Sequence, residues 1–285
     1  MLSDSLRQRL EALNRDRLPA DTPRAAPVGR PVAPAAPRRP LLAKSELLES
    51  AVVTENDAGE HLVMPIPVDD LWPGGEALVA DRLTHLQSMN AGALTPGLAP
   101  LIAALPDRAV LLDLETCGLS GSALFLVGLL RRVDGRLSVE LLFARNYAEE
   151  RAVMVSLWDR LTGVVGRGAE AIGTFNGKSF DWPMVMDRSR RHLLHKQREL
   201  REPTHVDVLH PARRRWKHQL PDCKLQTIER LVCRRTRTGD IPGGQIPAAY
   251  DAYVRTGQTV EVEAILNHNA LDLVTLLDIA MRVAA

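Results

Sequence analysis

The apolar run Ala-Val-Leu-Leu-Asp-Leu-Glu at residues 109–115 constrains the fold more than any other segment of the chain. A buried β-strand is the conformation expected for such a run. Its period of two then places Asp113 and Glu115 on one face, at the C-terminal end of the strand. Two neighbouring carboxylates repel each other unless a divalent cation lies between them. The pair alone carries little weight, because Asp-x-Glu occurs about once by chance in a chain of this length.

Further acidic residues follow at positions that would bring them to the same place. Asp181 comes just after a predicted strand at 171–175 and opens a helix, which puts it at the sheet edge where α/β proteins bind ligands. His268 and Asp272 are four residues apart in a predicted helix and therefore share a face. Each residue alone has a structural alternative: a helix N-cap for Asp181, a solvated acid for Asp272 and a surface histidine for His268. Together they predict an acidic site with one histidine.

The elements around these residues indicate an α/β domain. Strands are predicted at 109–115, 123–131, 137–144 and 171–175, with a hairpin turn at Val-Asp-Gly 133–135. Helices are predicted at 149–161, 180–195, 211–217, 224–232, 246–255 and 260–283. Three antiparallel strands, a helix, another strand and then helices predict a mixed central sheet flanked by helices.

The first 104 residues show less regular patterns. Residues 1–40 combine a short amphipathic helix at 3–17 with a Pro/Ala/Arg-rich stretch, which predicts a flexible N-terminal extension that could recruit a protein partner. Residues 41–104 are expected to be a small segment that packs on the main domain, with a hairpin near 56–59 and a helix at 76–87. The main domain is expected to span 105–285.

Charge is balanced over the whole chain (net +1) but not along it. Between residues 188 and 218 there are ten Lys or Arg residues and three acids. Such a stretch is either a nucleic-acid-binding surface or a solvated helix and loop, and charge alone does not decide between them. The three cysteines lack zinc-site spacing. No apolar run is long enough to span a membrane and no signal peptide is evident, so we expect a cytoplasmic protein.

Three motifs resemble those of the ribonuclease H-like DEDD 3′–5′ exonucleases, and within that superfamily the YprB-like bacterial branch. They are Asp-Leu-Glu-Thr at 113–116, Asn-Gly-Lys-Ser-Phe-Asp at 176–181 and His-Asn-Ala-Leu-Asp at 268–272. Segments 205–214, 224–229 and 240–244 add to the resemblance, which covers about residues 105–283. His268 precedes Asp272 by four residues, whereas five is usual in the histidine-containing branch of that superfamily.

The resemblance implies a ribonuclease H-like fold and two-metal hydrolysis of single-stranded DNA or RNA. Two Mg²⁺ or Mn²⁺ ions would be held by four acids, with Asp113 bridging and His268 as general base. Thr116 and Gly118 would lie near the terminal nucleotide, and Asn176 and Lys178 would contact phosphate or shape a turn. The metal ligands implied are Asp113, Glu115, Asp181 and Asp272. Asp207 is expected to have a structural or supporting role.

Two other interpretations remain open at the level of the sequence. One is a non-catalytic nucleic-acid-binding module that retains the fold, and the other is a scaffold that recruits partners through residues 1–40. The sequence does not distinguish DNA from RNA, or exonuclease from endonuclease action, and it leaves the oligomeric state open.

Overall fold

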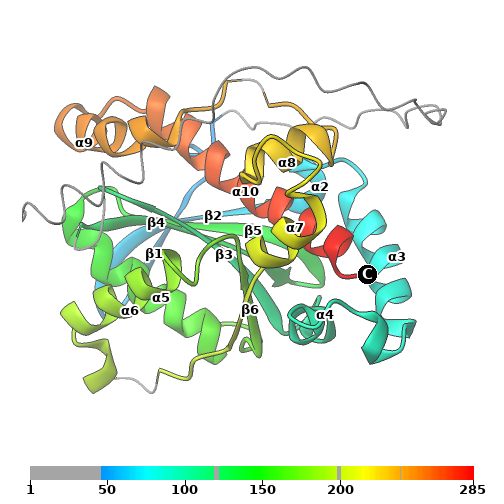
Figure 1. The fold of residues 1–285 in the computed structure, drawn as a ribbon. Coiled ribbons are helices and arrows are strands. Elements are labelled where there is room, and N and C mark those ends of the chain that lie inside the picture. The colour runs from blue at the N-terminus through cyan, green and yellow to red at the C-terminus, as the bar shows by residue number, and fades with distance from the viewer. Residues whose placement is uncertain (1–45, 119–121, 198–199, 238) are drawn as a thin grey trace, which may run out of the picture. The chain divides into compact units, whose positions relative to one another are not determined.

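The apolar strands predicted in the middle of the chain form part of a seven-stranded mixed sheet with helices on both faces (Figure 1). The computed structural model describes residues 46–118, 122–197, 200–237 and 239–285. The strand order is β1-β2-β5-β4-β3-β6-β7. The strands are β1 Val52–Asn56, β2 Gly59–Pro67, β3 Ala109–Thr116, β4 Leu124–Val133, β5 Arg136–Phe143, β6 Ala171–Thr174 and β7 Thr204–Asp207. The predicted fold class is therefore confirmed.

Strand direction brings three C-terminal ends to one edge of the sheet. Strands β3, β4 and β5 are antiparallel, and the β4–β5 turn contains Asp134 and Gly135 with φ of 48° and 84°. Positive φ at both central residues is what a type I′ hairpin turn requires, and the Asp-Gly pair supplies it. Strands β6 and β7 run parallel to β3. The residues that follow β6 and β7 therefore lie at the same edge as Asp113 and Glu115.

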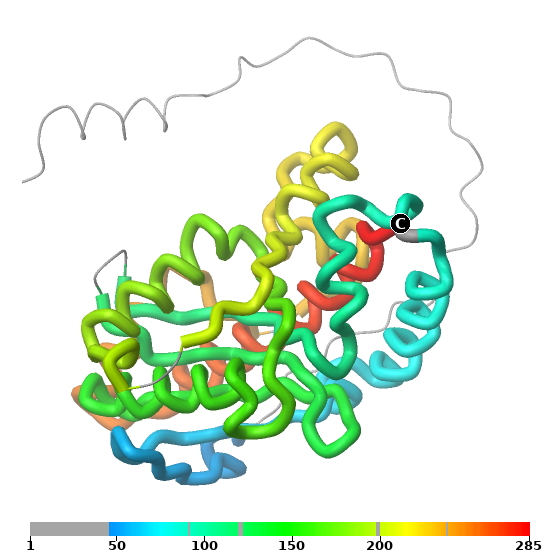
Figure 2. Tube along the Cα trace, turned by 90° about the horizontal axis from the view of Figure 1, so that it is seen from below, coloured from blue at the N-terminus to red at the C-terminus, as the bar shows by residue number. Residues whose placement is uncertain are grey.

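The helices form two layers with the sheet between them. Helix α10 packs on β3, β4 and β5 from one face, and α5 packs on β1, β2, β4 and β5 from the other. The strands lie between α10 above and α5 below in Figure 1, and Figure 2 views the sheet from the α5 side. Short 3-10 turns lie at 91–93, 147–149, 194–196 and 243–245. The α-helices are α2 Val68–Leu71, α3 Gly75–Ser88, α4 Ala99–Ala104, α5 Glu150–Thr162, α6 Asp181–Arg191, α7 Leu209–Trp216, α8 Leu225–Leu231, α9 Ile246–Thr256 and α10 Val260–Val283.

Helix α10 corrects one expectation from the sequence. Its 24 residues are long and apolar enough to cross a membrane by length and composition, although no such run was expected. However, 89% of the apolar window is buried inside the protein, against the sheet and the neighbouring helices. Burial on all sides explains the apolar composition, so α10 is the core helix of the domain and not a membrane span.

The N-terminal elements extend the central sheet. Strands β1 and β2 form the predicted hairpin, but β2 also pairs with β5 from Leu62↔Phe143 to Pro67↔Ser138. Residues 52–67 thus belong to the same sheet as residues 109–207, and the expected boundary near residue 104 does not interrupt it. The short strand β7 and helix α4 were not predicted. The predicted helix at 3–17 and the linker at 19–40 lie outside the described residues.

Candidate functional site

Four acidic side chains from three parts of the fold form one electrostatic cluster. Asp113 and Glu115 lie at the end of β3, Asp181 begins α6, and Asp272 lies on α10, which packs on β3. Desolvation raises the pKa of Asp113 well above its usual range, and the charges of Asp272, Glu115 and Asp181 raise it further. Carboxylates influence each other in this way only at short range, so the structure brings the four predicted acids together.

The position of Asp181 follows from the pairing of β6. Strand β6 pairs with β3 only as far as Leu111↔Gly173, so the end of β3 has a free edge toward the loop that follows β6. Asp181 is the first residue of α6 and is buried. Desolvation raises its pKa to about 7, although the backbone N–H groups of Asp181 and Leu114 donate to the carboxylate and act in the opposite direction. A backbone contact therefore ties Asp181 to β3.

Asn269 lies within the cluster and was not predicted from the sequence. Its Nδ2 donates to Oδ2 of Asp113 at 2.7 Å, and it also donates to Glu115. Gly128 on β4 stands opposite Asp113 in the sheet and leaves room for this amide. A Cβ at position 128 would lie 1.8 Å from Oδ1 of Asn269 and 2.8 Å from Cδ1 of Leu273. Glycine is thus required there so that α10 can approach the acidic strand.

Gly128→Ala should therefore disturb the packing of α10 against the strand that carries the acids. We expect it to lower the free energy of unfolding by about 1–3 kcal/mol, because either α10 or the Asn269 side chain must move to remove the clash. Chemical denaturation measures the loss. Gly97→Ala is the matched control, since a Cβ there meets nothing within 4 Å. Equal stability of Gly128→Ala and Gly97→Ala would contradict this packing.

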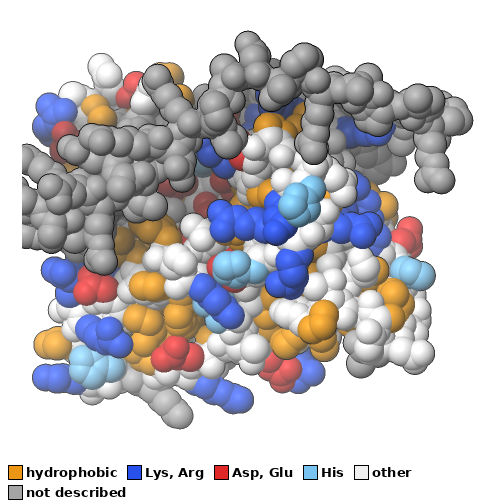
Figure 3. Space-filling view, viewed as in Figure 1, with side chains coloured by type: hydrophobic (Ala, Val, Ile, Leu, Met, Phe, Trp, Pro, Cys, Tyr) orange, Lys and Arg blue, Asp and Glu red, His pale blue; other side chains and the backbone are white. Residues whose placement is uncertain are grey.

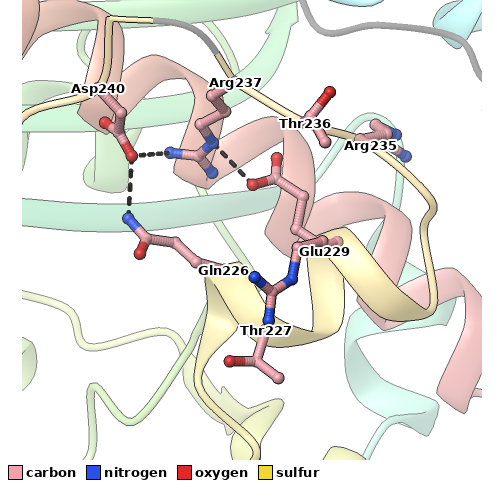
Figure 4. A pocket seen from close by; sticks show the side chains of 8 residues that line it. Gln226, Thr227, Glu229, Arg235, Thr236, Arg237 and Asp240 are labelled. Carbon is pink, nitrogen blue, oxygen red and sulfur yellow. Dashed lines mark hydrogen bonds and ion pairs between the residues drawn. The ribbon is translucent and has the colours of Figure 1, made fainter.

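Arg237 neutralises one side of the cluster. Its Nη1 lies 2.6 Å from Oδ1 of Asp272, and its Nε donates to Oε2 of Glu229 at 2.8 Å. Figure 4 shows Arg237 between Glu229 and Asp240 at the wall of a recess of about 290 Å³. Its guanidinium is almost fully buried, so it is a fixed internal cation beside the four acids.

The acids have protein partners that bear on metal binding. No group of three or more His, Cys, Asp or Glu residues in the described part of the chain is arranged so that it could hold a metal ion. Two acids of the cluster already have protein partners: Asp272 faces Arg237, and Asp113 accepts from Asn269. The donor set is nonetheless rich in carboxylate oxygens, which are the ligands that Mg²⁺ and Mn²⁺ prefer. An ion bound by Asp272 would compete with Arg237 for this carboxylate.

His268 lies beside the acids with both ring nitrogens facing carboxylates. Nδ1 is 2.6 Å from Oδ1 of Asp240, and Nε2 is 3.5 Å from Oδ2 of Asp272, one helical turn along α10. Burial by itself lowers the pKa of this imidazole, but the hydrogen bond to Asp240 and the charges of Asp272 and Glu115 outweigh burial and raise the pKa to about 9. The spacing of four thus places His268 and Asp272 on one face, as predicted.

The pKa shifts predict how the stability of the metal-free protein depends on pH. Desolvation and the neighbouring carboxylates raise the pKa of Glu115 to about 8 despite the charge of His268, whose own pKa is raised to about 9. The folded state then binds more protons than the unfolded chain, so its free energy of unfolding should fall as the pH rises from about 7 to about 9. The midpoint of thermal unfolding in a chelator measures this. Glu115→Gln should reduce this fall in stability. A midpoint of unfolding that rises between about pH 7 and pH 9 would contradict the raised pKa values of Glu115 and His268.

Thr116 and Gly118 border a separate recess of about 230 Å³ next to Glu115. Oγ1 of the buried Thr116 donates to the carbonyl oxygen of Gly118 at 2.6 Å and so holds the backbone after β3. Phe180 and the start of α9 at Ile246 complete the lining. Phe180 is one of the few large apolar side chains that remain exposed, at 37%. Two of the predicted substrate residues, Thr116 and Gly118, thus border a recess that Glu115 also lines.

Asn176 and Lys178 lie on the exposed loop that leads from β6 to Asp181. Their backbone N–H groups donate to Oδ1 and Oδ2 of Asp207 at 2.9 and 3.2 Å. The same carboxylate accepts from the backbone N–H of Leu209, so Asp207 joins the loop to the start of α7. Asn176 has a φ of 69°, which is typical of a turn. Asp207 supports the loop before Asp181, which agrees with its expected structural role.

The basic stretch predicted from the sequence divides between the interior and the surface. Arg188 is buried and pairs with Glu150, so it offers nothing to a ligand, and Arg191 pairs with Asp187. The exposed cations of the stretch fall into two sets. Arg190, Arg191, Lys196 and Arg201 lie on α6 or between α6 and β7. Arg213, Arg214, Arg215 and Lys217 lie on and just after α7, where basic side chains gather in Figure 3. Because α7 follows β7, this basic surface begins at the same sheet edge as the acids.

Three residues of the site were missed by the sequence analysis. Asn269 lies three residues before Asp272 and so shares its helix face, which is a signal that the periodicity of α10 contained. Arg237 and Asp240 lie in a loop without periodic pattern, and only the fold brings them to His268 and Asp272.

This chain is similar to a known family and to a known bacterial protein. A family model described as the RNase_H superfamily matches residues 110–284, which include all four acids and His268. The uncharacterized protein YprB of Bacillus subtilis (strain 168) is 32% identical over 172 residues. That alignment covers 59% of this chain but 40% of YprB, so the chain corresponds to less than half of its relative.

Proposed function

Because the chain belongs to the ribonuclease H superfamily and has a nuclease-type domain, we propose that it is a metal-dependent 3′–5′ exonuclease of single-stranded DNA or RNA. The observation that carries the proposal is the convergence of Asp113, Glu115, Asp181 and Asp272 at one sheet edge. A fold alone supports many functions, so the function has to be inferred from this cluster. Four acids that repel one another lower the stability of the folded protein unless cations lie between them.

Two Mg²⁺ or Mn²⁺ ions would be held by the four carboxylates. When bound, such a pair stabilises the attacking and leaving oxygens of an in-line phosphodiester hydrolysis. Asp113 would be one of the residues that hold the ions, because the three other acids all act on its carboxyl group. Asn269 would hold Asp113 in place, and Arg237 would release Asp272.

His268 in its neutral form would take the proton of the attacking water. Burial lowers the pKa of this imidazole, but the hydrogen bond to Asp240 and the charges of Asp272 and Glu115 raise it to about 9 in the metal-free protein. Cations held by Asp272 and Glu115 would offset those charges. The ring of His268 lies next to Asp272 and is held against rotation by Asp240. The recess beside Thr116 and Gly118 would receive the terminal nucleotide, because the exposed ring of Phe180 gives a base a surface on which to stack. The loop of Asn176 and Lys178 would lie along the phosphate backbone.

The basic surface on α7 would bind the strand behind the terminal nucleotide. The triple substitution of Arg213, Arg214 and Arg215 by Gln should raise KM and leave kcat nearly unchanged, since these side chains are exposed and away from the acids. The slope of log KM against log salt should fall by about 0.7 for each phosphate that the variant no longer binds. Arg136→Gln, at an exposed position in β5, is the control. An unchanged salt dependence would contradict the proposed path.

A non-catalytic nucleic-acid-binding module is the second candidate, and one observation favours it. Asp272 is already neutralised by Arg237, and the acids are not arranged around a metal position in the described residues. Such a module would bind single strands without cleaving them. Turnover by the purified chain therefore distinguishes the two functions.

The proposal is tested with 5′-labelled single-stranded and double-stranded DNA and RNA, each incubated with Mg²⁺, Mn²⁺ or a chelator. We expect a ladder of products that shorten from the 3′ end of single strands and appear only with a divalent ion. Internal fragments would indicate an endonuclease instead. Binding without any product under all metal conditions would favour the non-catalytic module.

A further inference from the structure

We propose that Asp240 is a positioning residue for His268 and fixes which nitrogen of its ring faces the reacting water. This inference rests on the proposed function, in which His268 acts as the general base. Its basis is the contact between Oδ1 of Asp240 and Nδ1 of His268 at 2.6 Å, which joins residues 28 positions apart in the chain.

The geometry leaves only one ring nitrogen for proton transfer. A nitrogen that donates its proton to a carboxylate cannot also accept one from water, so the contact with Asp240 assigns Nδ1 as a donor. Nε2 is then the atom available for water, and it lies 3.5 Å from Oδ2 of Asp272, on the side of the acids. A carboxylate that orients a histidine in this way sets both its tautomer and its direction.

Asp240 is itself held in place by its neighbours. Nε2 of Gln226 on α8 donates to Oδ2 of Asp240 at 3.0 Å, and Nη1 of Arg237 lies 3.9 Å from the same oxygen (Figure 4). Arg237 is fixed in turn by Glu229. The carboxylate is thus held by α8 and by the loop after it, while His268 belongs to α10. This arrangement gives the ring a fixed support outside its own helix.

The two partners of the contact between Asp240 and His268 differ in exposure, which a purely structural ion pair would not need. The Asp240 side chain is 24% exposed, so water could satisfy its carboxylate without His268. The imidazole is the buried partner, at 9% exposure, and it is the ring that loses its orientation when the contact is removed. A purely structural pair would affect stability without affecting the rate of the chemical step selectively.

The kinetic test compares Asp240→Asn with the conservative variant Asp240→Glu. Asp240→Asn should lower kcat by about 10- to 100-fold, which is typical of the loss of a supporting carboxylate, and leave KM within about twofold. Asp240→Glu should recover part of kcat, because it restores the charge. Asp222→Asn is the matched control: Asp222 is an exposed aspartate near α8, and its carboxylate accepts from the backbone of Lys224.

A double-substitution cycle separates positioning from an independent effect. In a His268→Gln background, Asp240→Asn should cause no further loss of kcat, because the ring that it positions is absent. An unchanged kcat in Asp240→Asn, or the full loss repeated in the His268→Gln background, would overturn the proposal.

A spectroscopic readout separates failure of this inference from failure of the proposed function. In protein labelled with ¹⁵N-histidine, the Nδ1 proton of His268 should appear strongly downfield because of the short contact, and Asp240→Asn should shift it upfield. Asp222→Asn should leave it in place. If the wild type hydrolyses no oligonucleotide but this shift is observed, the proposed function fails and the orientation by Asp240 stands. If Asp240→Asn leaves the proton unchanged, the positioning role is wrong.

Discussion

Asp113→Asn should abolish metal-dependent hydrolysis, with a loss on the order of 10³-fold or more in kcat, while the metal-free protein becomes more stable. The loss follows because Asp113 lies near all three other acids, each of which acts on its carboxyl group. Cations held at such a site supply several kcal/mol of transition-state stabilisation. The gain in stability follows because burial and the neighbouring acids disfavour the charged form of Asp113 in the folded state, whereas the amide is neutral in both states.

The two effects have opposite signs, which makes the variant diagnostic. Initial rates with Mn²⁺ and chemical denaturation in a chelator measure them on the same preparation. The control is Asp107→Asn: Asp107 precedes β3, and its carboxylate pairs with Arg132 at 3.5 Å, away from the cluster. Hydrolysis that survives in Asp113→Asn would remove this residue from the proposed machinery, and a destabilised Asp113→Asn would show that the acids do not repel one another.

Arg237→Leu should lower the free energy of unfolding of the metal-free protein by about 3–5 kcal/mol. The side chains of Arg237 and Glu229 are each 4% exposed, so removing the cation leaves a buried carboxylate without its ion-pair partner. Adding Glu229→Gln should restore part of the loss, because the uncompensated charge disappears. Denaturation in a chelator measures both variants.

The effect of divalent cations on the stability of Arg237→Leu provides a second test. With Arg237 absent, Asp272 is no longer held by its ion pair, so Mn²⁺ should stabilise Arg237→Leu by more than it stabilises the wild type. Arg255→Leu is the control, since Arg255 forms an exposed pair with Asp251 of the kind that contributes about 0–1 kcal/mol. Equal losses for Arg237→Leu and Arg255→Leu would mean that the buried network contributes little.

The part of the site that could be predicted from the sequence depends on short-range geometry. The period of two in β3 places Asp113 and Glu115 on one face, and the helical period of α10 places His268 and Asp272 on another. Asp181 follows β6 and begins a helix, so it lies at the same edge of the sheet because β6 is parallel to β3. Each of these inferences needs only local pattern and the direction of a strand.

The rest depends on contacts between distant segments. The pairing of β2 with β5 is set by which apolar edge is free when the sheet assembles, and no local pattern encodes that choice. Strand β7 has four residues within a basic stretch, so its hydrophobic signal is weak. The pairs of Arg237 with Asp272 and of Asp240 with His268 bridge a loop and a helix. Charge type identifies such residues as candidates, but only the fold assigns their partners.

Calorimetric titration of Mn²⁺ into the metal-free protein shows directly whether the carboxylate cluster is a metal site, and it does not depend on any substrate. We expect two bound ions in the wild type and in Asp107→Asn, and the loss of at least one of them in Asp113→Asn. Absence of binding in the wild type, or identical binding in Asp113→Asn, would contradict this expectation.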